Sequence, residues 1–204
     1  DVAAVADIVF WPVAMDIKYR DVEAMPDGSI DVCFFNGAIR TGENEHMARL
    51  LRTKSKTLVA FGACAQLGGV PGLANVANRG EVFDRTYRQS PSTRNTEAVT
   101  PQTSYKAEEG ELRLPEFYDT VRTLDQSVEV DYYVPGCPPP VALITRAVEA
   151  IVKGELPPRG SVLAPERSVC DECPRKREDK KITKIKRVYE ATPDEERCLL
   201  EQGF

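Results

Sequence analysis

The amino-acid sequence predicts an α/β protein with an open, flavodoxin-like parallel sheet, followed by a small cysteine-rich segment. Three observations indicate this fold. Four short apolar runs lie before Val141, helical patterns alternate with them, and a stretch rich in proline and glycine precedes a cysteine-bearing end. The chain has 204 residues, enough for one domain of ordinary size and an appendage.

The four apolar runs are expected to form the strands. They are rich in β-branched and aromatic side chains, and Gly, Pro or Asp bound each of them. Their apolar character is continuous rather than alternating, which is typical of strands buried on both faces of a parallel sheet. The runs are Val5–Trp11, Ile30–Phe35, Thr57–Gly62 and Glu129–Val134.

Two segments show the period of an amphipathic helix. Gly42–Lys54 places Met47, Leu50 and Leu51 on one face, with acidic residues in its first turn and basic residues in its last. Val141–Val152 carries an apolar stripe and is followed by Lys153 and Gly154, a typical helix end. The alternation of strands and helices predicts right-handed crossovers.

The sequence predicts two parts, a flavodoxin-like domain over residues 1–153 and a linker with a partial metal-binding segment over 154–204. Gly154–Ser168 contains three prolines and two glycines and is expected to be the linker. Residues 75–127 are mostly polar, and Ser90–Glu111 is expected to be an exposed excursion. Neither end of the chain has the character of a natural terminus, so we expect truncation at both.

Bulk composition narrows the function only slightly. The net charge is −5, which argues weakly against a nucleic-acid partner. No apolar run approaches the 18 or so residues that a membrane-spanning helix needs, so no membrane segment is expected.

Cys64 and Cys137 are the first candidate metal ligands. Cys64 follows the third predicted strand, in FGACAQLGG, and Cys137 follows the fourth, in VPGCPPP. The carboxyl ends of parallel strands meet at the edge where open α/β sheets bind ligands. Two thiols reaching one crevice from separate loops, with glycines that allow close backbone approach, predict an iron–sulfur cluster site. A buried small hydrophobe is the alternative for each cysteine taken alone.

Cys170, Cys173 and Cys198 form the second candidate set. A Cys-x-x-Cys pair followed by proline suits metal ligation better than a disulfide. Three thiols cannot complete a four-ligand site for zinc or for a 4Fe–4S cube, so a fourth ligand is expected from elsewhere, downstream of Phe204. Zinc is the main alternative metal.

Other reactive residues are interpreted as structural. Cys33 lies in the middle of a predicted strand and is expected to be a packed core thiol. His46, the single histidine, is expected to be solvated, and no Ser-His-Asp or Cys-His catalytic set can be built from it. The basic run Arg175–Arg187 is expected to be a solvated face, with docking to an acidic partner as the alternative.

These motifs carry a resemblance to a known family. GACAQLGG and VPGCPPP, with a Cys-x-x-Cys and a distant Cys behind them, resemble the small subunits of nickel–iron hydrogenases. The likeness is greatest to the cytoplasmic methyl-viologen-reducing type, which partners heterodisulfide reductase, and it also includes DIVFWPVAMDIKY, FFNGAIRTGENEHMARLL and VCDECPRKRE. It covers essentially the whole chain.

The resemblance implies a role for each candidate ligand. Cys64 and Cys137 would be half of the proximal 4Fe–4S site, whose other half is a Cys-x-x-Cys upstream of Asp1. Cys170, Cys173 and Cys198 would be three of the distal cluster's ligands, and the medial cluster would lie beyond Phe204. One departure is Asn36-Gly37, where many of these subunits have Glu-Gly, which puts any role of that glutamate in doubt.

The resemblance also implies a function and partners. The chain would relay electrons from dihydrogen oxidation in a large nickel–iron subunit to a downstream iron–sulfur or flavin protein, in the cytoplasm. Two alternatives remain: the single-cluster subunit of respiratory complex I, which shares the first two motifs but lacks the cysteine tail, and a zinc-stabilised interaction module.

Overall fold

The computed structural model describes residues 2–204. The chain divides into two compact units, Asp1–Ala164 and Pro165–Phe204, called here the sheet unit and the tail unit. The division falls inside Gly154–Ser168, the segment expected to be the linker, so Gly154–Ala164 belongs to the sheet unit rather than to the tail.

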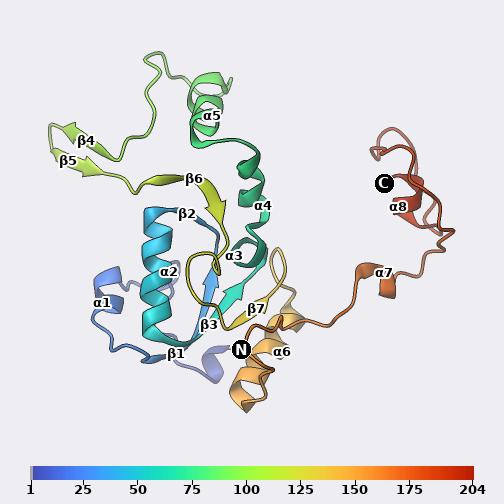
Figure 1. The fold of residues 1–204 in the computed structure, drawn as a ribbon, viewed down its shortest axis with the longest axis horizontal. Helices are drawn as coiled ribbons and strands as arrows, with labels where there is room; N and C mark the ends of the chain where they lie inside the picture. Colours follow the sequence, from blue (N-terminus) through green and yellow to red (C-terminus); the bar gives the residue numbers. More distant parts are fainter. Residues whose placement is uncertain (1) are drawn as a thin grey trace. The chain divides into compact units, whose positions relative to one another are not determined.

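The sheet unit carries most of the regular structure (Figure 1). In chain order its elements are η1 (Val2–Ala4), α1 (Tyr19–Glu23), β1 (Ile30–Asn36), β2 (Ile39–Thr41), α2 (Gly42–Lys54), β3 (Ser55–Phe61), α3 (Ala63–Leu67), α4 (Gly69–Gly72), η2 (Leu73–Val76), α5 (Arg79–Phe83), η3 (Asp84–Gln89), β4 (Ser104–Ala107), β5 (Gly110–Arg113), β6 (Phe117–Arg122), β7 (Tyr132–Val134) and α6 (Val141–Lys153). The tail unit contains α7 (Val169–Glu172) and α8 (Leu199–Gln202).

The predicted parallel sheet is confirmed. Its three strands lie in the order β1–β3–β7, and both pairings are parallel. Beside β7 the chain returns once more: the Tyr133 N–H donates to the Ser161 carbonyl at 3.2 Å, and the Leu163 N–H donates to the Tyr133 carbonyl at 2.7 Å. Part of the expected linker therefore extends the sheet beyond β7, because the edge of that strand would otherwise leave its polar backbone unpaired.

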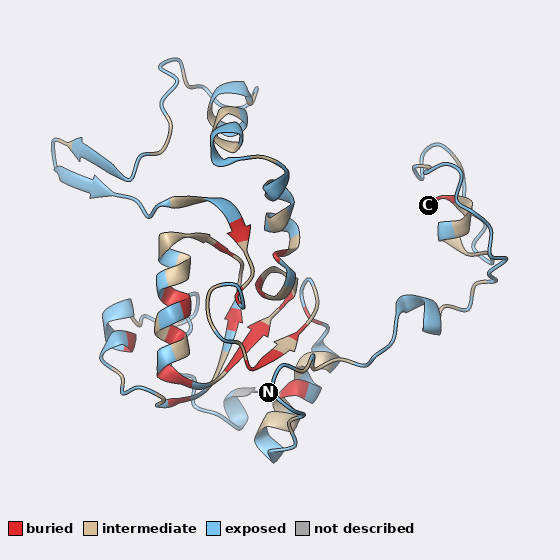
Figure 2. Cartoon of the chain, viewed as in Figure 1, coloured by how far each residue is buried: buried red, intermediate tan, exposed pale blue. Residues whose placement is uncertain are grey.

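Helices cover both faces of the sheet. Leu58 and Ala60 of β3 belong to a buried cluster that includes Met47 and Leu51 of α2. Val59, which points to the opposite face, packs instead in a cluster with β7 and Ala147 of α6. Figure 2 shows the buried residues concentrated along the strands and the inner side of α2. The continuous apolar runs are explained by this two-sided burial.

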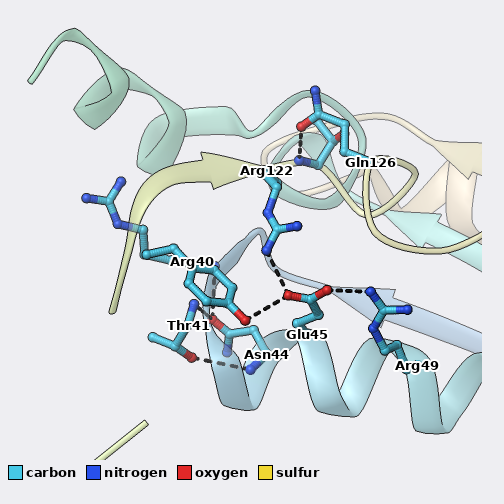
Figure 3. Close-up of polar contacts among 9 residues, drawn as sticks. Arg40, Thr41, Asn44, Glu45, Arg49, Arg122 and Gln126 are labelled. Atoms are coloured by element: carbon cyan, nitrogen blue, oxygen red, sulfur yellow. Dashed lines mark hydrogen bonds and ion pairs between the residues drawn. The ribbon is translucent and has the colours of Figure 1, made fainter. Parts of the chain in front are cut away.

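The helix α2 has the predicted bounds, and its start is set by a capping box. The Asn44 N–H donates to the Thr41 hydroxyl at 3.3 Å, and the Thr41 N–H donates to the Asn44 side-chain oxygen at 3.0 Å. The same first turn carries Glu45, which accepts hydrogen bonds from Tyr118 at 2.7 Å, Arg49 at 2.6 Å and Arg122 at 2.8 Å (Figure 3). These bonds lower the pKa of Glu45 to about 2, with the Tyr118 bond the largest cause.

The Glu45 carboxylate also links α2 to β6, which lies in the polar segment of residues 75–127. Tyr118 and Arg122 belong to β6, which pairs antiparallel with the short strand β2. Between Asn75 and β6 the chain forms short helices and the exposed hairpin β4–β5, which was not predicted from the sequence. Ser90–Glu111 is mostly exposed, as predicted.

Asp131 is a buried carboxylate that joins several elements just before β7. It accepts a hydrogen bond from the Leu58 N–H at 2.8 Å and pairs with Arg52 of α2 at 2.6 Å and with Arg159 at 3.2 Å. Burial would raise its pKa, but the bonds from Arg52 and Leu58 outweigh burial and hold the pKa below its usual value.

One predicted strand is wrong. Val5–Trp11 is not a strand; the chain turns at Trp11, whose carbonyl accepts hydrogen bonds from the Ala14 and Met15 N–H groups. Val5 and Trp11 are exposed, and of this run Phe10 packs against the core. Apolar composition alone suggested a strand, but among residues 2–204 no strand pairs with this backbone.

The helices within residues 2–204 are short or amphipathic. None of them combines the length and the apolar character that crossing a bilayer requires.

Candidate metal centres

Cys64 lies where the sequence predicts, immediately after β3. Gly62 follows the last residue of the strand with φ +88°, a backbone angle that favours glycine, and α3 begins at the next residue. Cys64 is half-buried in the first turn of this helix. The Leu124 N–H donates to the Ala65 carbonyl at 2.8 Å, which fastens the turn to the chain after β6. The backbone that carries the Cys64 thiol is therefore held by the end of β3 and by the hydrogen bond from Leu124.

The loop of Cys137 lies beside that of Cys64. The Gly62 N–H donates to the Val134 carbonyl at 2.7 Å, and the Ala63 N–H donates to the Gly136 carbonyl at 2.7 Å. Cys137 itself is exposed. Two backbone hydrogen bonds thus join the chain just before each cysteine, so both thiols issue from one edge of the sheet, as parallel strands in register require.

Two glycines in this region have no room for a side chain. At Gly69, where φ is +55°, a Cβ atom would lie 2.8 Å from the Cys64 sulfur and 2.9 Å from its Cα. At Gly136, where φ is +135°, it would lie 2.4 Å from the Pro139 Cα. The backbone of Gly69 therefore packs directly against Cys64.

The tail unit places its Cys-x-x-Cys on a single helical turn. Ser168 caps α7 by a reciprocal capping box with Asp171, whose carboxylate accepts from the Ser168 N–H at 2.7 Å. Cys170 lies inside the turn and is exposed, whereas Cys173 ends it and is half-buried.

Cys198 is brought to the same place by a short backbone pairing. The Lys176 N–H donates to the Glu196 carbonyl at 2.9 Å, and the Cys198 N–H donates to the Lys176 carbonyl at 2.8 Å. A pocket of roughly 280 Å³ opens here, and Cys170 and Cys198 both line it, together with Arg177 and Lys180. Thiols separated by more than two dozen positions in the sequence therefore share one pocket.

Cys173 has a cationic neighbour that was not expected from the sequence. The Arg175 Nη1 donates to the Cys173 sulfur at 3.9 Å. The Arg175 backbone N–H is the largest cause of a lowered pKa of the Cys173 thiol, and the Arg175 side chain is the next. A lowered pKa favours the thiolate, which is the form that binds metals. The signal in the sequence was an arginine two residues after the second cysteine of the pair.

Neither set of cysteines is a complete metal site. Within residues 2–204 no group of three or more His, Cys, Asp or Glu side chains is arranged to hold a metal ion. All six cysteines are free thiols. Burial raises the pKa of Cys33 to about 11, which fits its predicted place as a core thiol, and His46 is exposed with its Nε2 3.4 Å from Glu23.

The chain belongs to the family described as "NADH ubiquinone oxidoreductase, 20 Kd subunit", whose match covers residues 1–151. Within this class its sequence is similar to that of an iron–sulfur subunit of the F420-non-reducing hydrogenase from Archaeoglobus profundus, with 48% identity over 97% of this chain and 64% of that protein. A subunit of the F420-non-reducing hydrogenase vhu from Methanocaldococcus jannaschii is 37% identical over 97% of this chain and 61% of that protein.

A solved structure is similar as well. It is a crystal structure of an NAD+-reducing nickel–iron hydrogenase in the H2-reduced state, with 27% identity and a TM-score of 0.54 over 63% of this chain and 67% of that one. The predicted fold class and the predicted resemblance to hydrogenase small subunits are thereby confirmed. The chain spans less than two thirds of the length of the two curated relatives.

Proposed function

We propose that this chain is part of an electron-transfer subunit of a nickel–iron hydrogenase. The observation that carries the proposal is the pair of backbone hydrogen bonds that holds the Cys64 and Cys137 loops together at the carboxyl edge of the sheet. The tail unit supports it too. This unit lies beyond the family match at residue 151, yet the F420-non-reducing relatives cover 97% of the chain and so share it.

The five candidate cysteines have the chemistry that 4Fe–4S clusters need. We assign Cys64 and Cys137 to a proximal cluster and Cys170, Cys173 and Cys198 to a distal one, each completed by residues outside this chain. The close approach of Gly69 to Cys64 and the pocket shared by Cys170 and Cys198 fit such a group. When bound, the clusters supply one-electron redox chemistry, and the protein positions and tunes them.

The partners follow from the two sites. The edge of the sheet that carries Cys64 and Cys137 would face a large nickel–iron subunit, from which electrons leave after dihydrogen is oxidised. The tail unit would pass them to a downstream iron–sulfur or flavin protein, such as heterodisulfide reductase. Support comes from the names of the relatives, which are hydrogenase subunits, and from the fact that the two cysteine sets belong to different compact units.

The ligand assignment is tested by Cys137→Ser in the full-length subunit within its complex. Loss of one thiolate should reduce the iron content and remove the low-temperature magnetic-resonance signal of one reduced cluster, while the sheet still folds. Cys33→Ala is the matched control, since it removes a thiol from the same unit without touching either candidate site. Unchanged iron and unchanged signal in the Cys137 variant would refute the assignment.

A second pair of variants separates the roles of the two sites. Cys173→Ser should leave hydrogen–deuterium exchange at nickel–iron largely intact but strongly reduce electron delivery to an external acceptor. Cys64→Ser should disturb the cluster beside the large subunit and the assembly of the pair. If Cys173→Ser spares acceptor reduction and the tail unit yields zinc on metal analysis, the tail site is structural.

A further inference from the structure

Arg175 connects the two segments that carry the tail cysteines. Its Nη1 donates to the Cys173 sulfur at 3.9 Å, and its Nε donates to the Glu195 carbonyl at 3.1 Å, three residues before Cys198. One half-buried guanidinium thus contacts both sides of the candidate site.

Arg175 differs from the basic residues that line the pocket in forming no ion pair among the described residues. Arg177 and Lys180, which line the pocket, pair with Asp179 and Glu178. In the part of the chain that the structure describes, no carboxylate forms an ion pair with Arg175. Its positive charge and its Nη1 group therefore act on the sulfur of Cys173.

We propose that Arg175 is a positioning residue that raises the reduction potential of the cluster at the tail site, an inference that rests on the proposed function. Reduction adds a negative charge that is shared with the ligating sulfurs. A hydrogen bond to a sulfur and an unpaired cation beside it stabilise the reduced state more than the oxidised state. The bond to Glu195 keeps the guanidinium in place and holds the Cys198 segment against the Cys-x-x-Cys turn.

The test is a redox titration of the assembled complex, followed by low-temperature magnetic resonance, on the wild type and three variants. Arg175→Gln removes the charge, Arg175→Lys keeps the charge but loses the planar fork, and Lys181→Gln removes a charge from an exposed side chain of the same segment. We expect Arg175→Gln to lower the midpoint potential of the tail cluster alone. A tenfold fall in the equilibrium constant for reduction corresponds to a shift of about 59 mV for one electron.

The outcomes are distinct. A lower potential of the tail cluster in Arg175→Gln, with wild-type iron content and little change in Lys181→Gln, supports the proposal. The same potential in the wild type and Arg175→Gln overturns it, as does an equal shift in Lys181→Gln. If Arg175→Gln does not bind the cluster, the midpoint potential of the tail cluster in Arg175→Lys is compared with the potentials of the wild type and Lys181→Gln by the same criteria. A wild-type tail that contains zinc and no cluster signal overturns the cluster assignment itself, and the inference with it.

Discussion

Replacing Gly69 by alanine should disturb Cys64 directly. Gly69 has φ +55°, and the added Cβ would lie 2.8 Å from the Cys64 sulfur, 2.9 Å from its Cα and 3.0 Å from its nitrogen. Two of these three atoms are backbone, so a change of side-chain rotamer cannot remove the clash. The turn that carries Cys64 would have to shift, and the thiol would shift with it.

The loss of stability in Gly69→Ala has two causes. A left-handed backbone costs an alanine about 1–2 kcal/mol, and overpacking adds about 1–3 kcal/mol, so we expect a total loss of stability of about 2–5 kcal/mol. With a urea m-value of about 2 kcal/mol/M, the unfolding midpoint should fall by roughly 1–2.5 M.

Gly28→Ala is the matched control for this variant. Gly28 has φ +67°, but nothing lies within 4 Å of an added Cβ, so alanine there has the backbone cost alone. Urea unfolding and iron content should be measured on both variants in the full-length subunit. Gly28→Ala should lose stability but keep its iron, whereas Gly69→Ala should lose more stability and also lose iron. If the two variants match in midpoint and in iron content, the packing of Gly69 on Cys64 has no part in the site.

Three further predictions concern titratable groups. Asp131→Asn should destabilise the protein by about 2–3 kcal/mol at neutral pH, because the buried Leu58 N–H and Arg52 lose a charged partner. The pKa of Asp131 is lower in the folded than in the unfolded protein, so its contribution to stability is present above the unfolded pKa of about 3.9 and is lost as pH falls through the folded pKa. The stabilities of the variant and the wild type should therefore converge in acid. Glu45→Gln should behave likewise: it should lower the free energy of unfolding by about 1–2 kcal/mol above the unfolded pKa of about 4.3, and this loss should disappear toward about pH 2. If urea titrations gave a constant difference in stability between variant and wild type across this range, the pairing of Glu45 would be contradicted. Cys33→Ala should cost about 1 kcal/mol or less in thermal unfolding and leave the iron content unchanged.

The parallel sheet was predictable because burial on two faces leaves a direct mark on the sequence. Residues 58–60 are all apolar since successive side chains enter two different clusters, one under α2 and one under α6. Helix α2 was predictable to the residue because its apolar residues share one face and its charges follow the helix dipole, whereas its Thr41 cap was found in the structure. The placement of Cys64 and Cys137 followed from the sheet alone, since chain order and parallel pairing bring their loops to one edge.

The remaining features depend on contacts that sequence periodicity does not contain. Val5–Trp11 has the composition of a strand, but a strand is defined by its partner, and none pairs with it in the described chain. Residues 160–163 have the composition of a linker, yet they lie against β7 because that edge was free. Asp131 is predictable only when Arg52, from a helix 79 positions away, is known to reach it.

The two cysteine sets differ in what supports them, and this difference bears on their proposed roles. The Cys64 and Cys137 loops rest on a sheet whose strands and helices are buried, so their geometry is set by the fold before any metal binds. The tail unit contributes no residue to the hydrophobic core, and Ile185, Val188 and Tyr189 are exposed. A segment of this size without a core gains its order from a ligand or a partner. For the proposed clusters we therefore expect binding to be coupled to folding in the tail unit and largely independent of folding in the sheet unit. A rigid site suits a cluster that stays fixed beside a catalytic subunit, and a ligand-ordered site suits one that meets an exchanging redox partner.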